Sequence, residues 1–173
     1  MDESRRLIVL RHAKSTWPDG VPDRDRPLAA RGLRDAPAAG RRLREAGLLP
    51  DAVLCSPARR TRQTWELVAQ ELGAAPETGY DEQLYDASGA DLLRVLREVP
   101  ERVRTLLMVG HLPGVQELTL VLAGETVGDA RERAAAKFPT SAMAVLTLGV
   151  PWARASEGAG VLTEFTVPRG PKT

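Results

Sequence analysis

Short apolar runs that end abruptly at polar residues recur along the chain. Residues 7–10 are four consecutive large aliphatics, and the run stops at Arg11. Such a run predicts a strand that is covered on both faces of a sheet. Residues 51–55 and 105–109 repeat the pattern, and His111 closely follows the last of them. The sequence therefore predicts three buried strands with polar residues just beyond their carboxyl ends.

The segments between these strands carry apolar residues at helical spacing. In the first segment Leu33, Ala36, Gly40 and Leu43 share a face, and Pro37 is expected to kink or divide the helix. Gly47 is a plausible residue to end it. Helices are predicted over residues 28–46, 57–72, 88–99 and 115–122, with a shorter one near 131–136.

The second of these helices has marked start and stop signals. Ser56 is placed to cap its amino end, Pro57 to occupy the first helical position, and Gly73 to follow its last turn. Residues 144–148 and 161–167 are two further predicted strands, which would form an antiparallel hairpin at an edge of the sheet. Residues 168–173 are predicted to be a loose tail.

This alternation of strands and helices predicts an α/β fold, a three-layer sandwich in which helices flank a mostly parallel central sheet. The length of 173 residues is that of one domain, spanning 1–173. With 24 basic and 23 acidic residues, the net charge of +1 argues against nucleic acid or a membrane as the main partner. We expect a cytoplasmic protein, because no apolar run is long enough for a membrane span or signal peptide.

The candidate chemistry lies at the predicted strand ends. If the three strands run parallel, Arg11, His12 and His111 meet at one edge of the sheet, where ligands bind in open α/β sheets. The helix after the second strand begins with three arginines, which is unfavourable at the positive end of a helix dipole unless an anion binds there. Of these we assign Arg59 to the anion, with Arg60 and Arg62 turned to solvent.

Two fixed cations and two imidazoles suit a phosphoryl group. Guanidinium groups bind its oxygens bidentately, and phosphoryl transfer needs mainly positioning and charge neutralisation. One histidine would attack in its neutral form, because nearby arginines lower its pKa. The other, if protonated, would donate to the phosphoryl oxygens. The residues alone do not decide which histidine is the nucleophile.

Two other classes of protein are compatible with these residues. A metal-dependent hydrolase would use the two histidines with carboxylate ligands, but flanking arginines would repel a divalent cation, so we predict no metal and no cofactor. A phosphate-recognising module would keep the pocket without turnover. Cys55, the sole cysteine, permits no internal disulfide.

Five ordered motifs extend over nearly the whole chain: residues 10–15, residues 25–28 with Arg31-Gly32, residues 55–59 with Gln63-Thr64, Gly110-His111, and residues 138–142. With them the chain resembles the histidine phosphatase superfamily, and within it the SixA-type phosphohistidine phosphatases. The resemblance implies a minimal phosphoglycerate mutase-like fold without large insertions. It also implies that His12 is phosphorylated during turnover and that Arg11, Arg59 and His111 line the phosphate pocket.

The resemblance leaves the proton donor and the substrate open. Asp86 is the first candidate for the acid and Glu82 the second, while SixA-type proteins tend to lack a clear acid. The substrate would be phosphohistidine on a protein or a small phosphorylated metabolite, including simple phosphomonoesters. Ser15 is equally suited to a turn and to a phosphate contact, and Trp17 to a lid and to a loop anchor. The oligomeric state is not predicted.

Overall fold

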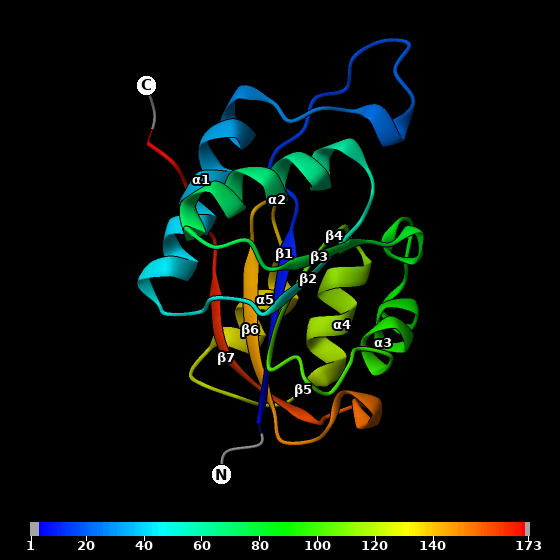
Figure 1. The fold of residues 1–173 in the computed structure, drawn as a ribbon, viewed down its shortest axis with the longest axis vertical. Coiled ribbons are helices and arrows are strands. Elements are labelled where there is room, and N and C mark those ends of the chain that lie inside the picture. Colours follow the sequence, from blue (N-terminus) through cyan, green and yellow to red (C-terminus); the bar gives the residue numbers. More distant parts are fainter. Residues whose placement is uncertain (1–3, 172–173) are drawn as a thin grey trace.

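A seven-stranded sheet forms the centre of the computed structural model, which describes residues 4–171 (Figure 1). The strands are β1 (Arg5–Arg11), β2 (Ala52–Cys55), β3 (Glu77–Tyr80), β4 (Thr105–Gly110), β5 (Ala123–Thr126), β6 (Met143–Leu148) and β7 (Gly160–Thr166). The helices are α1 (Ala30–Glu45), α2 (Arg59–Leu72), α3 (Gly89–Arg97), α4 (Gly114–Leu122) and α5 (Ala130–Ala136). Short 3-10 helices are η1 (Asp23–Asp25), η2 (Glu82–Leu84) and η3 (Trp152–Arg154). The strands are arranged in the sheet in the order β3-β2-β4-β1-β6-β7-β5.

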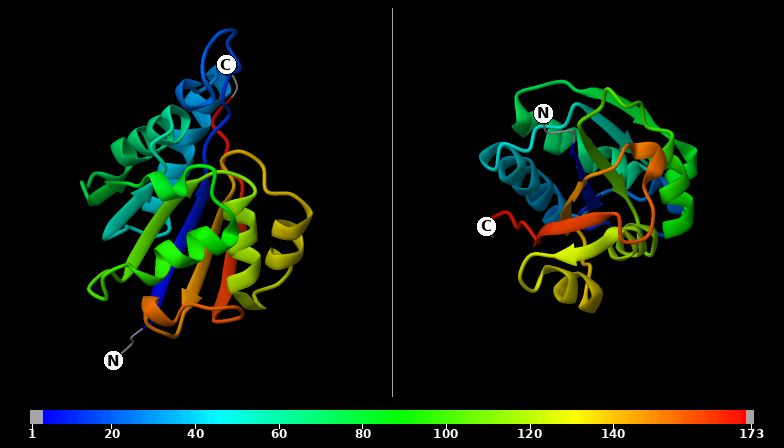
Figure 2. Two further views of the ribbon diagram at one scale, coloured as in Figure 1. Left: turned by 90° about the vertical axis from the view of Figure 1, so that its right-hand side faces the viewer. Right: turned by 90° about the horizontal axis from the view of Figure 1, so that it is seen from below.

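Helices cover both faces of this sheet, as Figure 2 shows. Strand β1 illustrates the division, because successive side chains of a strand point to opposite faces. Leu7 and Val9 belong to the core under α3, α4 and α5, whereas Ile8 and Leu10 belong to the core under α1 and α2. The predicted three-layer α/β sandwich is confirmed.

The three strands that carry the candidate chemistry are neighbours and run parallel. Strand β4 pairs with β1 on one side and with β2 on the other. In this register Arg11 lies opposite Gly110, and Cys55 lies opposite Val109. The carboxyl ends of the three strands are therefore level, so the residues that follow them enter the same edge region of the sheet.

The last two strands form the predicted antiparallel hairpin, but this hairpin does not lie at an edge of the sheet. Strand β6 is antiparallel to both β1 and β7, and β5 pairs parallel with β7. Among the described strands, β3 and β5 form the edges. Both have only four residues, and most of these are polar or exposed. The hydrophobic pattern misses such strands because an edge strand buries little apolar surface.

Helix α1 runs from Ala30 to Glu45 without division at Pro37. The carbonyl that loses its hydrogen-bond donor at Pro37 is that of Leu33, four residues earlier. Leu33 is 50% exposed rather than part of the buried face. Water can therefore solvate this side of the helix, and the helix is not divided at Pro37.

Helix α2 begins at Arg59, two residues later than predicted. Ala58 occupies the N-cap position and makes no side-chain capping bond, while Gly73 ends the helix in the left-handed conformation as predicted. Ser56 and Pro57 lie in the loop before the helix. The Ser56 side chain contacts His111 instead of capping the first turn.

The described part of the predicted tail is fixed to α1. The Gly170 amide donates to Asp35 Oδ1 at 2.9 Å, and Arg169 donates to Asp35 Oδ2 and to the Thr140 carbonyl. The prediction of a loose tail is thus wrong for residues 168–171, because the buried Asp35 needs partners. Residues 172–173 lie outside the described part, as do residues 1–3. No helix between residues 4 and 171 has the length and apolarity to cross a membrane.

Gly32, in the first turn of α1, lies directly against the chain after His12. A Cβ atom at this position would be 2.2 Å from the Lys14 carbonyl oxygen, a backbone atom that cannot rotate away. We expect Gly32→Ala to lower the free energy of unfolding by about 3 kcal/mol through overpacking, measured by urea denaturation. Gly149→Ala is the matched control, since a Cβ atom added there would have open space within 4 Å. Equal stability of the two variants would contradict the close approach.

Candidate active site

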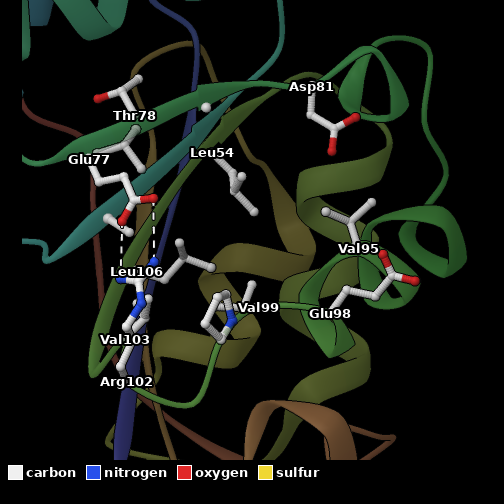
Figure 3. A pocket seen from close by; sticks show the side chains of 14 residues that line it. Leu54, Glu77, Thr78, Asp81, Val95, Glu98, Val99, Arg102, Val103 and Leu106 are labelled. Carbon is white, nitrogen blue, oxygen red and sulfur yellow. Dashed lines mark hydrogen bonds and ion pairs between the residues drawn. The ribbon is translucent and has the colours of Figure 1, made fainter.

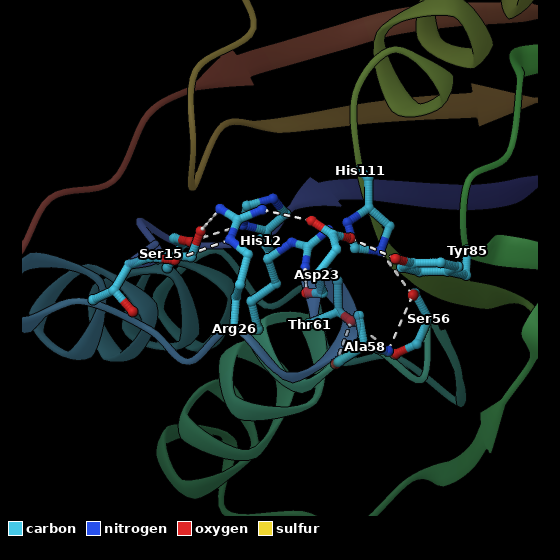
Figure 4. A network of polar contacts seen from close by, with 12 residues as sticks. His12, Ser15, Asp23, Arg26, Ser56, Ala58, Thr61, Tyr85 and His111 are labelled. Carbon is cyan, nitrogen blue, oxygen red and sulfur yellow. Dashed lines mark hydrogen bonds and ion pairs between the residues drawn. The ribbon is translucent and has the colours of Figure 1, made fainter. Parts of the chain in front are cut away.

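A pocket of about 340 Å³ opens at the carboxyl ends of β1 and β4. Figure 4 shows the polar side chains that converge around His12 and His111. Among the described residues no carboxylate lines the pocket, whereas three arginines and one lysine do. Its lining consists of Arg11, His12, Lys14, Ser15, Trp17, Arg26, Arg60, His111, Leu112 and Thr140.

His12 is held as a neutral imidazole with one defined tautomer. Its Nδ1 lies 2.8 Å from the Ala13 carbonyl oxygen, which can only accept, so Nδ1 carries the hydrogen and Nε2 keeps its lone pair. Burial lowers the pKa of His12 to about 3, and the charges of His111, Arg11 and Arg60 act in the same direction. The ring is therefore an available nucleophile at neutral pH.

The backbone around His12 is fixed from two sides. The Ala13 amide donates to Thr64 Oγ1 of α2 at 3.0 Å. On the other side the Ser141 amide donates to the His12 carbonyl, and the Arg11 side chain donates to the Phe138 carbonyl at 2.9 Å. These contacts explain why motifs near residues 63–64 and 138–142 accompany the Arg-His pair.

His111 lies beside His12, with ring centroids 5.3 Å apart. Its Nε2 is 2.7 Å from Ser56 Oγ, while its Nδ1 is buried without a hydrogen-bond partner among the described residues. Burial, followed by the charge of Arg60, lowers the pKa of His111 to about 4. The ring is therefore neutral at neutral pH. If the Ser56 hydroxyl donates to Nε2, the hydrogen on Nδ1 is free for a ligand.

Arg60, and not Arg59, supplies the second arginine of the pocket. Arg60 is 6% exposed and donates to the Asp23 carbonyl at 2.7 Å and to Asp23 Oδ2 at 3.1 Å. Arg59 is exposed and lines a different hollow on the surface. The prediction of Arg59 is wrong by one position. A signal was present, because Arg60 stands four residues before the buried Thr64 and eight before Val68, on the buried face of α2.

The structure does not bring the two predicted acids into the pocket. Asp86 is exposed, with a left-handed φ of 57°. Glu82 is exposed and pairs with Arg24 at 2.5 Å. The residue between them that does reach the site is Tyr85, whose ring meets the His111 ring edge-on with centroids 5.7 Å apart. Asp86 and Glu82 are therefore poorly placed to protonate a leaving group.

Asp23, which the sequence did not indicate, is a carboxylate that pairs with two arginines of the pocket. It accepts hydrogen bonds from Tyr85 Oη at 2.5 Å, Arg26 Nη1 at 2.9 Å and Arg60 Nη2 at 3.1 Å (Figure 4). The bond from Tyr85, with those from Arg26 and Arg60, holds the pKa of Asp23 far below its usual range. The carboxylate stays ionised, so it positions Arg60 rather than donating a proton.

Ser15, for which the sequence left a turn and a phosphate contact open, lies in the wall of the pocket. It is buried, pairs across a short bridge with Leu28, and lines the pocket. Its Oγ accepts a hydrogen bond from Arg26 Nη2 at 2.7 Å. The predicted loop of residues 15–26 is thus tied to the pocket through Arg26.

A second hollow, of about 280 Å³, lies between β2, β3 and the end of α3 (Figure 3). Its floor is apolar, with Leu54, Val99 and Leu106, and Glu77 pairs with Arg102 at its rim. It contains neither histidine. The described residues also include no group of three or more histidine, cysteine or carboxylate side chains suited to a metal ion.

The chain belongs to the histidine phosphatase superfamily (branch 1), whose family model matches residues 7–142. The resemblance drawn from the motifs is thereby confirmed. A curated relative is an uncharacterised protein of Mycobacterium tuberculosis, which is 44% identical over 162 residues, covering 92% of this chain and all of that protein. An uncharacterised protein of Mycobacterium leprae is 38% identical over 165 residues, with the same shares covered.

Solved structures extend this likeness to the whole fold. A protein of Nakamurella multipartitia assigned as a phosphohistidine phosphatase SixA matches with a TM-score of 0.83 and 31% identity, covering 95% of this chain and 96% of that one. A protein histidine phosphatase SixA complexed with tungstate matches with a TM-score of 0.76 and 25% identity, covering 94% and 97%. Family and matches together support a phosphatase.

The two neighbouring arginines at the start of α2 provide a matched pair of variants. We expect Arg60→Ala to lower kcat/KM by about 100-fold or more, because it removes a preorganised cation from the pocket. Arg59→Ala should change kcat/KM by less than about threefold, as is usual for an exposed side chain. Steady-state kinetics with an aryl phosphate, on variants whose folding is checked by circular dichroism, tests this. A larger loss for Arg59→Ala would contradict the geometry.

His12 and His111 are the chain's only histidines, so all histidine ring signals in an NMR spectrum of the protein come from these two residues. We expect neither ring signal in NMR spectra to titrate between about pH 8 and about pH 5. The unfolded chain takes up both protons near its ordinary histidine pKa of about 6.5. Stability should therefore fall as the pH drops from about 6.5 towards about 4. Titration of a ring near pH 6.5 in the folded protein would contradict this.

Proposed function

We propose that the protein is a metal-independent phosphohydrolase that passes the phosphoryl group through His12, with phosphohistidine as the preferred class of substrate. One observation carries the proposal. Arg11 Nε, Arg60 Nε and His111 Nδ1 are buried nitrogens without hydrogen-bond partners in the described part of the chain. Such groups are costly unless a ligand satisfies them, and an oxyanion can accept from all three.

In the first step the lone pair of His12 Nε2 attacks phosphorus and forms a P–N bond. The bond between phosphorus and the leaving atom breaks, and the leaving atom takes the electron pair. The phosphorylated ring becomes cationic because Nδ1 keeps its hydrogen. The Ala13 carbonyl, 2.8 Å from Nδ1, stabilises that charge.

In the second step water attacks the phosphoryl group. The P–N bond breaks, its electron pair returns to Nε2, and the water proton is released with inorganic phosphate. Arg11 and Arg60 neutralise the charge on the phosphoryl oxygens throughout both steps, and the neutral His111 ring donates a hydrogen bond to one of them. His12 then returns to the neutral tautomer in which it began.

The acid-base groups of the site favour a leaving group that needs little protonation. Asp23 is ionised, and neither Asp86 nor Glu82 lines the pocket. An alkyl ester would release a strongly basic alkoxide and would need an acid. A phosphohistidine whose second ring nitrogen carries a proton releases a neutral imidazole, a weak base that needs no acid from the site. Phosphohistidine therefore suits this site better than an alkyl phosphomonoester does.

The charge of the pocket supports catalysis without a metal ion. Arg11, Arg26 and Arg60 line it together with Lys14, and no carboxylate between residues 4 and 171 does. These cations supply the neutralisation that a divalent ion provides in other phosphatases, and they would repel such an ion. A pure phosphate-recognising module would need no nucleophile, yet the tautomer and neutrality of His12 prepare it for attack.

A trapping experiment tests the phosphohistidine intermediate. Rapid denaturation with radiolabelled acetyl phosphate or phosphohistidine peptide should yield a phosphoprotein that is stable in base and labile in acid, as a phosphoramidate is. His12→Ala should lose both the label and turnover, and a chelator should leave turnover unchanged. Full turnover by His12→Ala, inhibition by the chelator, or a label on another residue would contradict the proposal.

A further inference from the structure

Two large apolar side chains stay exposed at the active-site pocket, whose other eight lining residues are all polar, four of them arginine or lysine. Trp17 is 76% exposed and Leu112 is 37% exposed, and both line the pocket. The chain's other tryptophans, Trp65 and Trp152, are buried. An exposed indole forgoes a large hydrophobic gain. Its position beside the phosphate-binding groups suggests that a ligand covers it.

Arg26 holds this indole in place. The centre of its guanidinium lies 3.3 Å from the centre of the Trp17 ring, a close cation-π stack. Arg26 itself is buried and is fixed by donation to the Thr16 carbonyl, Asp23 Oδ1 and Ser15 Oγ. The stack covers one face of the indole, and its high exposure shows that much of the remaining surface is open. The ring is thus a fixed apolar surface.

The floor of the pocket cannot distinguish one phosphorylated compound from another. Arg11, Arg60 and the two histidines would meet the phosphoryl oxygens, which all phosphomonoesters and phosphoramidates share. Discrimination must come from residues that reach the rest of the substrate. At this pocket these are Lys14, Ser15, Arg26, Thr140 and the two exposed apolar side chains. A flat ring gains by packing on an indole, whereas a polyol would lose water from its hydroxyl groups there.

We infer that Trp17 is a specificity-determining residue whose open surface packs against a flat leaving group, with Leu112 as a second apolar contact. The inference rests on the proposed function, because it assumes that the phosphoryl group occupies the cationic floor. It adds to that function a residue that selects imidazole or phenyl groups over sugars and glycerol.

Binding of two phosphonates tests the inference without turnover, because their P–C bonds are not hydrolysed. We expect the wild-type protein to bind phenylphosphonate about tenfold more tightly than methylphosphonate in isothermal titration calorimetry. Trp17→Ala should abolish this preference and change the affinity for methylphosphonate by less than about twofold. Trp17→Phe should keep most of the preference, since a phenyl ring can still stack.

Val127→Ala is the matched control, because Val127 is a 58% exposed apolar residue next to β5 and away from the pocket. It should bind both phosphonates as the wild type does. An unchanged preference in Trp17→Ala would overturn the inference, as would its absence in the wild type. Equal losses of affinity for both phosphonates in Trp17→Ala would also overturn it, since Trp17 would then only support Arg26. A missing phosphoenzyme with the phosphonate preference intact would instead contradict the proposed function alone.

Discussion

The level carboxyl ends of β1, β4 and β2 are the constraint on which the site depends. Because the three strands are parallel and in register, they bring Arg11, His12 and His111 together with the loop that leads into α2. The result is a concentration of buried cationic and imidazole groups that the described residues do not neutralise fully. Three of their nitrogens have no hydrogen-bond partner among the described residues. An oxyanion is a ligand that can accept hydrogen bonds from all three.

Through Asp23, the loop of residues 15–26 offsets part of the positive charge of the pocket. Asp23 pairs with Arg60 and Arg26 and accepts from Tyr85, which orients the arginines while leaving Arg60 Nε unpartnered among the described residues. The same loop carries Trp17, stacked on Arg26. One segment thus both positions Arg60, which is proposed to bind the phosphoryl group, and presents the surface proposed to meet the leaving group.

Much of this arrangement could be predicted from the sequence, because buried strands and amphipathic helices carry strong periodic signals. The edge strands β3 and β5 could not, since they are short and polar. The assignment of Arg59 in place of Arg60 was avoidable, because helical spacing puts Arg60 on the same buried face as Thr64 and Val68. Asp23 and Tyr85 meet across 62 positions of sequence, and that contact depends on loop conformation, which no local pattern encodes.

The unpartnered nitrogens are proposed to surround a phosphoryl group attached to His12 Nε2, and every other part of the mechanism depends on this placement. A crystal structure of the protein with vanadate, which adopts the geometry of phosphoryl transfer, tests it most directly. We predict vanadium bonded to His12 Nε2, with its oxygens accepting from Arg11, Arg60 and His111 Nδ1. Vanadate bound through His111, or held at Arg59 outside the pocket, would contradict it.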